Sequence, residues 1–99
     1  MATAFIREYA GVGLHGALQA PAEPGIADQT VTTSATSAQS NAFNANTTFI
    51  AISTPAAQAV ACLFGASPTA LVSSLRLPAN SLVFFGVKAG QKVALIDVT

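Results

Sequence analysis

The sequence predicts an all-β protein: an antiparallel β-sandwich, with jelly-roll topology the favoured arrangement and an extended arm at the N-terminus. About six to eight short apolar runs follow one another, with turn residues about every eight to twelve positions, which is the spacing of sandwich strands. No segment carries a convincing helical period. The chain is 52% hydrophobic and only 8% charged, so it can collapse around a core rather than remain disordered.

Ninety-nine residues are enough for one domain. Residues 1–27 are predicted to form the arm and residues 28–99 the sandwich domain. The arm begins with a short strand over residues 4–9. Beyond it, glycines and prolines disfavour a regular ladder and favour an extended path. They are Gly11, Gly13, Gly16, Pro21, Pro24 and Gly25.

The remaining strands are expected over residues 29–39, 47–53, 56–64, 71–77, 82–87 and 92–98. The first of these is rich in Thr and Ser and is expected at a sheet edge. Residues 56–64 are rich in Ala, which also favours a helix, but the space between Pro55 and Gly65 suits a strand better.

The last two strands, joined by residues 88–91, carry the pattern of a hairpin. Both are apolar on both faces, so something must cover the second face. The sequence leaves open whether that cover is the N-terminal arm or another copy of the chain.

Self-association is the expected source of extra stability. Small residues dominate the composition, the single Cys62 cannot form a disulfide within the chain, and a net charge of zero gives little protection against association. A dimer or trimer is therefore expected. The candidate contact residues are Phe5, Tyr9 and Leu14 in the arm and Val83 and Phe85 in a two-sided apolar strand.

Composition argues against several classes of partner. Four Lys and Arg residues balance four Asp and Glu residues, so the chain lacks the cationic surface that binds nucleic acid. The small apolar stretch 55–66 is interrupted by Gln58 and is too short to span a bilayer, so no membrane association is expected. The N-terminus lacks the pattern of a signal peptide, which predicts synthesis in the cytoplasm.

No catalytic, cofactor or metal site is predicted, and we expect the protein not to be an enzyme. Residues 11–16 match G-x-G-x-x-G, but Pro21 and Pro24 leave no room for the helix that a dinucleotide site requires. One His and one Cys, His15 and Cys62, are too few for a zinc site. The acidic residues are scattered along the chain, at Glu8, Glu23, Asp28 and Asp97.

Four segments together resemble a known group of proteins. They are residues 36–50 with Ala-Phe-Asn-Ala, residues 63–70 with Phe-Gly-Ala-Ser-Pro-Thr-Ala, residues 77–80 with Leu-Pro-Ala-Asn, and residues 85–94 with Phe-Gly-Val. The set resembles small structural proteins of tailed phages and prophages and covers about two thirds of the chain, residues 1–27 matching least. The resemblance implies a β-sandwich in the virion, specifically a capsid decoration (cement) protein on the head surface that contacts the major capsid protein. It brings no catalytic residues.

The alternative of another class is a small fibre or head–tail component with a ligand- or glycan-binding β-module. Such modules usually present exposed aromatic rings to sugars. The chain has no Trp and one Tyr, which favours the decoration protein.

Overall fold

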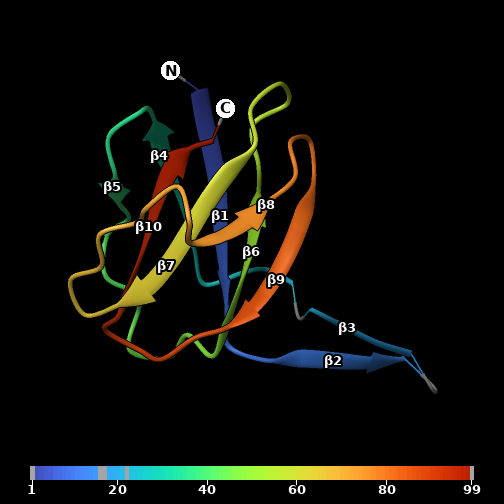
Figure 1. Ribbon diagram of the computed structural model, residues 1–99. Helices are drawn as coiled ribbons and strands as arrows, with labels where there is room; N and C mark the ends of the chain where they lie inside the picture. Colours follow the sequence, from blue (N-terminus) through green and yellow to red (C-terminus); the bar gives the residue numbers. More distant parts are fainter. Residues whose placement is uncertain (1, 16–17, 22, 99) are drawn as a thin grey trace.

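The computed structural model describes residues 2–15, 18–21 and 23–98, and within residues 12–20 it describes the backbone alone. Two antiparallel four-stranded sheets face each other and a two-stranded hairpin extends from them (Figure 1). The strands are β1 (Ala2–Tyr9), β2 (Val12–His15), β3 (Leu18–Pro21), β4 (Ala27–Thr33), β5 (Ala38–Gln39), β6 (Phe49–Ser53), β7 (Val60–Gly65), β8 (Leu75–Leu77), β9 (Leu82–Gly86) and β10 (Lys92–Asp97). The described residues contain no helix, and therefore none of the length and apolarity that crosses a membrane. The prediction of an all-β protein is confirmed, and the arrangement is compatible with a β-sandwich.

The first sheet has the order β4-β1-β6-β9, with β1 at an inner position. Strand β1 pairs with β4 from Ala2 opposite Thr33 to Glu8 opposite Ala27, and with β6 from Phe5 opposite Ser53 to Tyr9 opposite Phe49. Because side chains alternate between the two faces of a strand, the even-numbered residues of β1 point into the sandwich and the odd-numbered ones point outward. Ala4 and Ile6 are accordingly buried.

The second sheet has the order β5-β10-β7-β8. Its facing side chains and those of the first sheet form one apolar core, to which every strand of the two sheets except β5 and β9 contributes a buried residue. The buried members are Ala4, Ile6, Val31, Phe43, Ile50, Ile52, Val60, Cys62, Leu77, Val93 and Leu95. Val83 and Phe85 of β9 and Ala38 of β5 are partly buried against it.

The second face of β10 is covered by the chain itself. Ala94 and Ile96 on that face lie in a small cluster with Ala61, Ala70 and Val98. The loop that carries Ala70 is held in place by polar contacts: Ser37 Oγ accepts a hydrogen bond from the Ala70 amide at 2.9 Å, and Gln39 Nε2 donates one to the Pro68 carbonyl at 2.7 Å. Neither the N-terminal arm nor another copy of the chain, the two covers considered from the sequence, is therefore needed to cover this face of β10.

Strands β9 and β10 do not form the hairpin that their spacing predicts. They belong to different sheets, β9 pairing with β6 and β10 with β5 and β7. The connection between them crosses from one sheet to the other and is fixed to Phe43, whose amide donates to the Gln91 carbonyl at 2.9 Å and whose carbonyl accepts from the Gly90 amide at 3.1 Å. The crossing lets each strand turn one apolar face to the common core.

The expected arm of residues 1–27 is not confirmed by its first part. Strand β1 is paired on both sides and belongs to the same body as residues 28–99. Residues 12–15 and 18–21 do follow a path outside the two large sheets, but as a ladder, with Val12 opposite Pro21 and His15 opposite Leu18. Glycines weaken a strand without preventing backbone pairing.

Other predicted strands are confirmed with shorter bounds. Residues 29–39 correspond to β4 at a sheet edge and to the short β5, and residues 56–64 correspond to β7. Of residues 71–77 only Leu75–Leu77 are a strand, because a turn closed by the Ser74 amide and the Leu71 carbonyl at 2.9 Å precedes them.

The core predicts a sharp contrast between two leucines in adjacent strands. Leu95 is fully buried in β10, whereas Leu63 in β7 is 43% exposed. We expect Leu95→Ala to lower the free energy of unfolding by about 2–5 kcal/mol and Leu63→Ala to lower it by about 1 kcal/mol or less. Urea denaturation followed by circular dichroism measures both. Equal losses in the two variants would contradict the assigned facing of these strands.

Candidate functional site

The outer face of the first sheet carries a group of exposed apolar side chains. The register places outward residues in cross-strand rows: Thr30, Phe5, Ser53 and Leu82 in one, Asp28, Arg7, Ala51 and Phe84 in the next, and Tyr9, Phe49 and Gly86 in the third. We call Phe5, Tyr9, Phe49, Leu82 and Phe84 the aromatic face. Leucine 82 is 61% exposed, Phe5 57% and Phe84 48%.

Ring contacts join part of this face into one surface. The rings of Tyr9 and Phe49 stack with centroids 5.0 Å apart, and those of Phe49 and Phe84 are tilted with centroids 6.4 Å apart. An open groove of about 530 Å³ lies beside them, with Phe5, Arg7, Thr30 and Leu82 among its walls. Exposed apolar side chains gathered in this way are typical of interaction surfaces.

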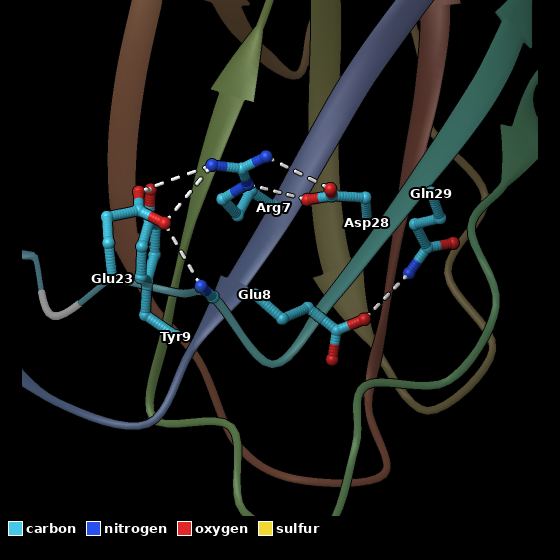
Figure 2. A network of polar contacts seen from close by, with 7 residues as sticks. Arg7, Glu8, Tyr9, Glu23, Asp28 and Gln29 are labelled. Atoms are coloured by element: carbon cyan, nitrogen blue, oxygen red, sulfur yellow. Dashed lines mark hydrogen bonds and ion pairs between the residues drawn. The ribbon is translucent and has the colours of Figure 1, made fainter.

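Among the described outward residues of this sheet, the one cation is Arg7, and two acidic residues neutralise it (Figure 2). Its Nε and Nη2 donate to Asp28 Oδ1 and Oδ2 at 2.7 and 3.1 Å, and its Nη1 donates to Glu23 Oε1 at 3.2 Å. Tyr9 donates its hydroxyl proton to Glu23 Oε2 at 2.7 Å. This network ties the segment that follows β3 to β1, so it fastens the base of the hairpin to the sheet.

The network shifts the pKa of each of its members. The Tyr9 hydrogen bond and then Arg7 hold the pKa of Glu23 below its ordinary value, and Arg7 does the same for the pKa of Asp28. Burial, followed by the hydrogen bond to Glu23, raises the pKa of Tyr9. The hydrogen bond and charge of Asp28 raise the pKa of Arg7 further above its usual range. All four groups therefore keep at neutral pH the charge states on which their contacts depend.

Gly25 is needed for the close approach of this segment to β1. A Cβ at this position would lie 2.8 and 2.9 Å from Cγ and Cδ of Arg7 and 3.0 Å from the Glu8 carbonyl oxygen. The Gly25 amide also donates to Glu23 Oε1 at 3.0 Å. The side chain of Arg7 thus reaches both carboxylates by passing over a residue without a Cβ.

Glu8 points inward, between the two sheets, and is buried with no cationic partner among the described side chains. Its Oε1 accepts hydrogen bonds from the Asn44 amide and the Thr47 hydroxyl, both at 2.7 Å, and its Oε2 accepts one from Gln29 Nε2 at 3.3 Å (Figure 2). Hydrogen-bond donors of this kind compensate a carboxylate for the loss of water. Glu8 therefore serves to hold the loop before β6 against β1 and β4.

The structure separates the five residues predicted as contacts. Phe5 lies on the aromatic face as an exposed side chain. Tyr9 belongs to that face but is buried under the Glu23 contact. Val83 and Phe85 point toward the core, so the outward positions of β9 are their neighbours, Leu82 and Phe84. The side chain of Leu14, in β2, lies outside the described residues.

Sequence reasoning missed Leu82 and Phe84 because β9 is apolar on both faces. Alternation gives two sets of residues in such a strand and does not say which one meets the core. It also missed the contacts of Arg7 with Glu23 and Asp28, which lie 16 and 21 positions further along the chain. The pairing of β1 with β4 brings them together.

The other residues considered as possible chemical sites occupy structural positions in the fold. Cys62 is buried in β7, as predicted, and burial raises the pKa of its thiol to about 11. Of the G-x-G-x-x-G segment, residues 12–15 form β2 of an antiparallel hairpin rather than the approach to a helix, and Gly16 lies outside the described residues. Within the described part of the chain, no three His, Cys, Asp or Glu side chains are grouped as metal ligands.

Comparisons with known proteins give no match: no family model fits the chain, and neither curated proteins nor solved structures are similar to it.

Replacing Gly25 tests the packing of this site. We expect Gly25→Ala to lower the free energy of unfolding by about 1–3 kcal/mol, because the added methyl group overlaps the Arg7 side chain and the Glu8 carbonyl. Gly11→Ala is the matched control, since nothing lies within 4 Å of a Cβ there. Thermal unfolding of both variants measures the difference. Equal stability of the two would show that Gly25 has no special role.

The Arg7 network also predicts a dependence of stability on pH. Because the pKa values of Glu23 and Asp28 are lowered in the folded protein, their stabilisation is complete above their ordinary values of 4.5 and 3.8 and is lost as the pH falls through the folded values. The urea midpoint of the wild type should therefore fall between about pH 7 and about pH 3 more than that of Arg7→Met. Glu8 is common to both proteins, so their difference isolates the network. Parallel pH profiles would contradict this assignment.

Proposed function

We propose that this protein is a bacteriophage virion structural protein, acting as a capsid decoration protein that stabilises the head through contacts with the major capsid protein and with copies of itself. The observation that carries the proposal is the aromatic face: Phe5, Leu82 and Phe84 are exposed together on one sheet of a protein with few charges. A surface of this kind favours burial against another protein. The resemblance of residues 36–94 to small phage structural proteins supplies the particular class.

The strand pairing supports a jelly-roll within this proposal. In a jelly-roll, strand pairs nest within one another, as in a long hairpin rolled around a core. Here β7 pairs with β8, β6 with β9 and β5 with β10. Continued nesting would pair β4 with a strand that follows β10. In this protein β4 pairs with β1 instead, so the first strand of the chain takes that position. Jelly-rolls are common in viral capsid proteins and also in lectins.

The hairpin β2–β3 is the part of the predicted arm that supports a contact with the capsid. In the described part of the chain it forms a separate sheet in which each strand pairs with the other alone, and it extends from the body beside the first sheet (Figure 1). An isolated two-stranded hairpin is marginally stable in water. Its base is held by the contacts of Arg7 and Tyr9 with Glu23, so a partner surface would meet an element that is already oriented.

A glycan-binding β-module in a fibre or head–tail component is the second candidate. The groove beside Phe5 favours it, because an exposed aromatic ring lies there next to Thr30 and Asp28, whose side chains offer hydrogen bonds. The groove is open, and of its two aromatic residues Phe5 is exposed and Tyr9 is buried, which leaves a limited platform for a sugar. Binding to a glycan array without binding to phage heads would favour this candidate.

The proposal predicts that the protein is present in mature particles. Virions produced by the strain that carries the gene should contain the tryptic peptide 77–88, which is bounded by Arg76 and Lys88. Added protein should also co-sediment with heads that lack it. Absence of the peptide from purified virions, together with absence of head binding, would contradict the proposal.

A variant without the hairpin tests how the head is contacted. Val12 and Pro21 are opposite each other, so two glycines can replace residues 13–20 and close the chain as a short turn. We expect this variant to fold, because β1 and the Glu23 contacts are retained, and to lose most of its head binding in co-sedimentation. Phe5→Ser, which removes an exposed side chain of the aromatic face, serves as an independent test of that face. Undiminished binding by both variants would exclude these surfaces.

A further inference from the structure

We infer that a second copy of this chain pairs with the free edge of β9, in antiparallel orientation about a two-fold axis that passes beside Phe84. Strand β9 ends the order of the first sheet, and its one partner in the described chain is β6. The inference rests on the proposed function, because it names the surface through which copies of the protein associate. It concerns a sheet edge, and the partner is identical to the protein itself.

The direction of the backbone groups of β9 follows from its ladder with β6. The Thr54 amide donates to the Ser81 carbonyl at 2.8 Å, and the Val87 amide donates to the Thr48 carbonyl at 3.0 Å. In an antiparallel ladder, alternate residues turn their N–H and C=O groups to the same neighbour. Positions 81, 83, 85 and 87 therefore face β6, and the N–H and C=O groups of Leu82, Phe84 and Gly86 point to the free edge.

This edge lacks the features that usually protect a sheet from pairing. Short strands, charged side chains, proline and bulges are the common protections. Strand β8 has three residues and includes the exposed Arg76, β5 has two residues, and β4 carries the ion-paired Asp28. Strand β9 has five residues, Leu-Val-Phe-Phe-Gly, with neither a charge nor a proline. Its outward side chains, Leu82 and Phe84, are exposed.

The pattern of free groups is self-complementary, as pairing with a second copy in antiparallel orientation requires. With Phe84 opposite the partner's Phe84, Leu82 lies opposite the partner's Gly86 and Gly86 opposite the partner's Leu82. Every residue with free backbone groups then meets another such residue, as hydrogen-bonded pairs require. A shift of the register by two positions leaves one of them without a match. A symmetric dimer needs a surface that is complementary to itself in this way.

Side chains and charges agree with the same register. Gly86 stands next to Phe49 in its row, and no atom lies within 4 Å of where its Cβ would be, so the partner's Leu82 has room beside the Phe49 ring. Two Phe84 rings meet across the axis, a favourable cross-strand pair. Lys88, the charge nearest the end of β9, lies opposite the partner's Asn80, so no like charges oppose each other. Phe5 lies two strands from this edge and stays available to the capsid.

A charge swap at position 84 tests the axis. Sedimentation equilibrium should show a concentration-dependent dimer for the wild type and monomers for Phe84→Lys and Phe84→Glu, because each variant places like charges opposite each other. An equimolar mixture of the two variants should recover the dimer. Leu71→Lys is the control, since Leu71 is exposed by 59% in a loop away from β9 and should leave the dimer intact. Circular dichroism establishes that each variant is folded.

Cysteine cross-linking provides a measurement that does not depend on weakening the contact. Hydrogen-bonded antiparallel pairs hold their Cα atoms about 5.5 Å apart, within the range of a disulfide. Under mild oxidation Phe84→Cys should form a covalent dimer, whereas Phe5→Cys, exposed on the same face but two strands from the edge, should form much less. The buried Cys62 is present in both variants and does not distinguish them.

The outcomes separate this inference from the proposed function. A dimer that survives in Phe84→Lys, a mixture that stays monomeric, or equal cross-linking at positions 5 and 84 would overturn pairing through β9, even if the protein binds phage heads. A wild type that is monomeric at all concentrations would overturn it as well. Failure of the wild type to bind heads while the charge swap behaves as expected would overturn the decoration role and leave the dimer established.

Discussion

The position of β1 between β4 and β6 is the constraint on which the rest of the structure depends. Pairing on both sides fixes which residues of this strand point inward, so Ala4 and Ile6 join the core and Glu8 anchors the loop before β6. The same pairing places Phe5, Arg7 and Tyr9 outward. Since a shift of one residue would exchange the two faces, the core and the candidate site are determined by a single register.

The outer face of the first sheet is mainly apolar in its interactions because its charged groups neutralise one another. Arg7 and its two carboxylates lie in the middle of the aromatic face, and mutual pairing satisfies them without a partner. The contacts are exposed, so their contribution to global stability is modest. Their effect is local: they orient the segment after β3 and leave the neighbouring apolar side chains as the groups with most to gain from burial. This favours association through Phe5, Leu82 and Phe84 over recognition of a charged ligand.

The two surfaces proposed for association have different physical origins. The aromatic face offers apolar area, which gains free energy on burial with little demand on direction. The β9 edge offers unpaired backbone groups, which demand a specific register and orientation. A decoration protein that uses the edge for its own dimer and the rest of the face for the capsid would separate these tasks. The small body of the protein, which buries a limited core, makes such external contacts valuable for its stability.

Much of the fold was predictable from the sequence, because alternation and turn residues are local signals. They identify β6 and β7 with their neighbouring turns, the edge position of β4, the lack of helix among the described residues and the burial of Cys62. The surface for association that the sequence also indicates stays a prediction. The function itself stays a proposal that rests on the resemblance and on the exposed face.

The tertiary structure decided between alternatives that local sequence signals do not distinguish. Strand β9 has two apolar faces, and the packing of Val83 and Phe85 against the opposite sheet selects Leu82 and Phe84 as the outward pair. Strands β9 and β10 are neighbours in sequence but enter different sheets, since each completes a different side of the core. The sequence determined which segments extend, because that preference lies within each strand. Which strands pair, and hence which side chains reach the surface, depends on contacts between distant residues, and those exist only in the folded chain.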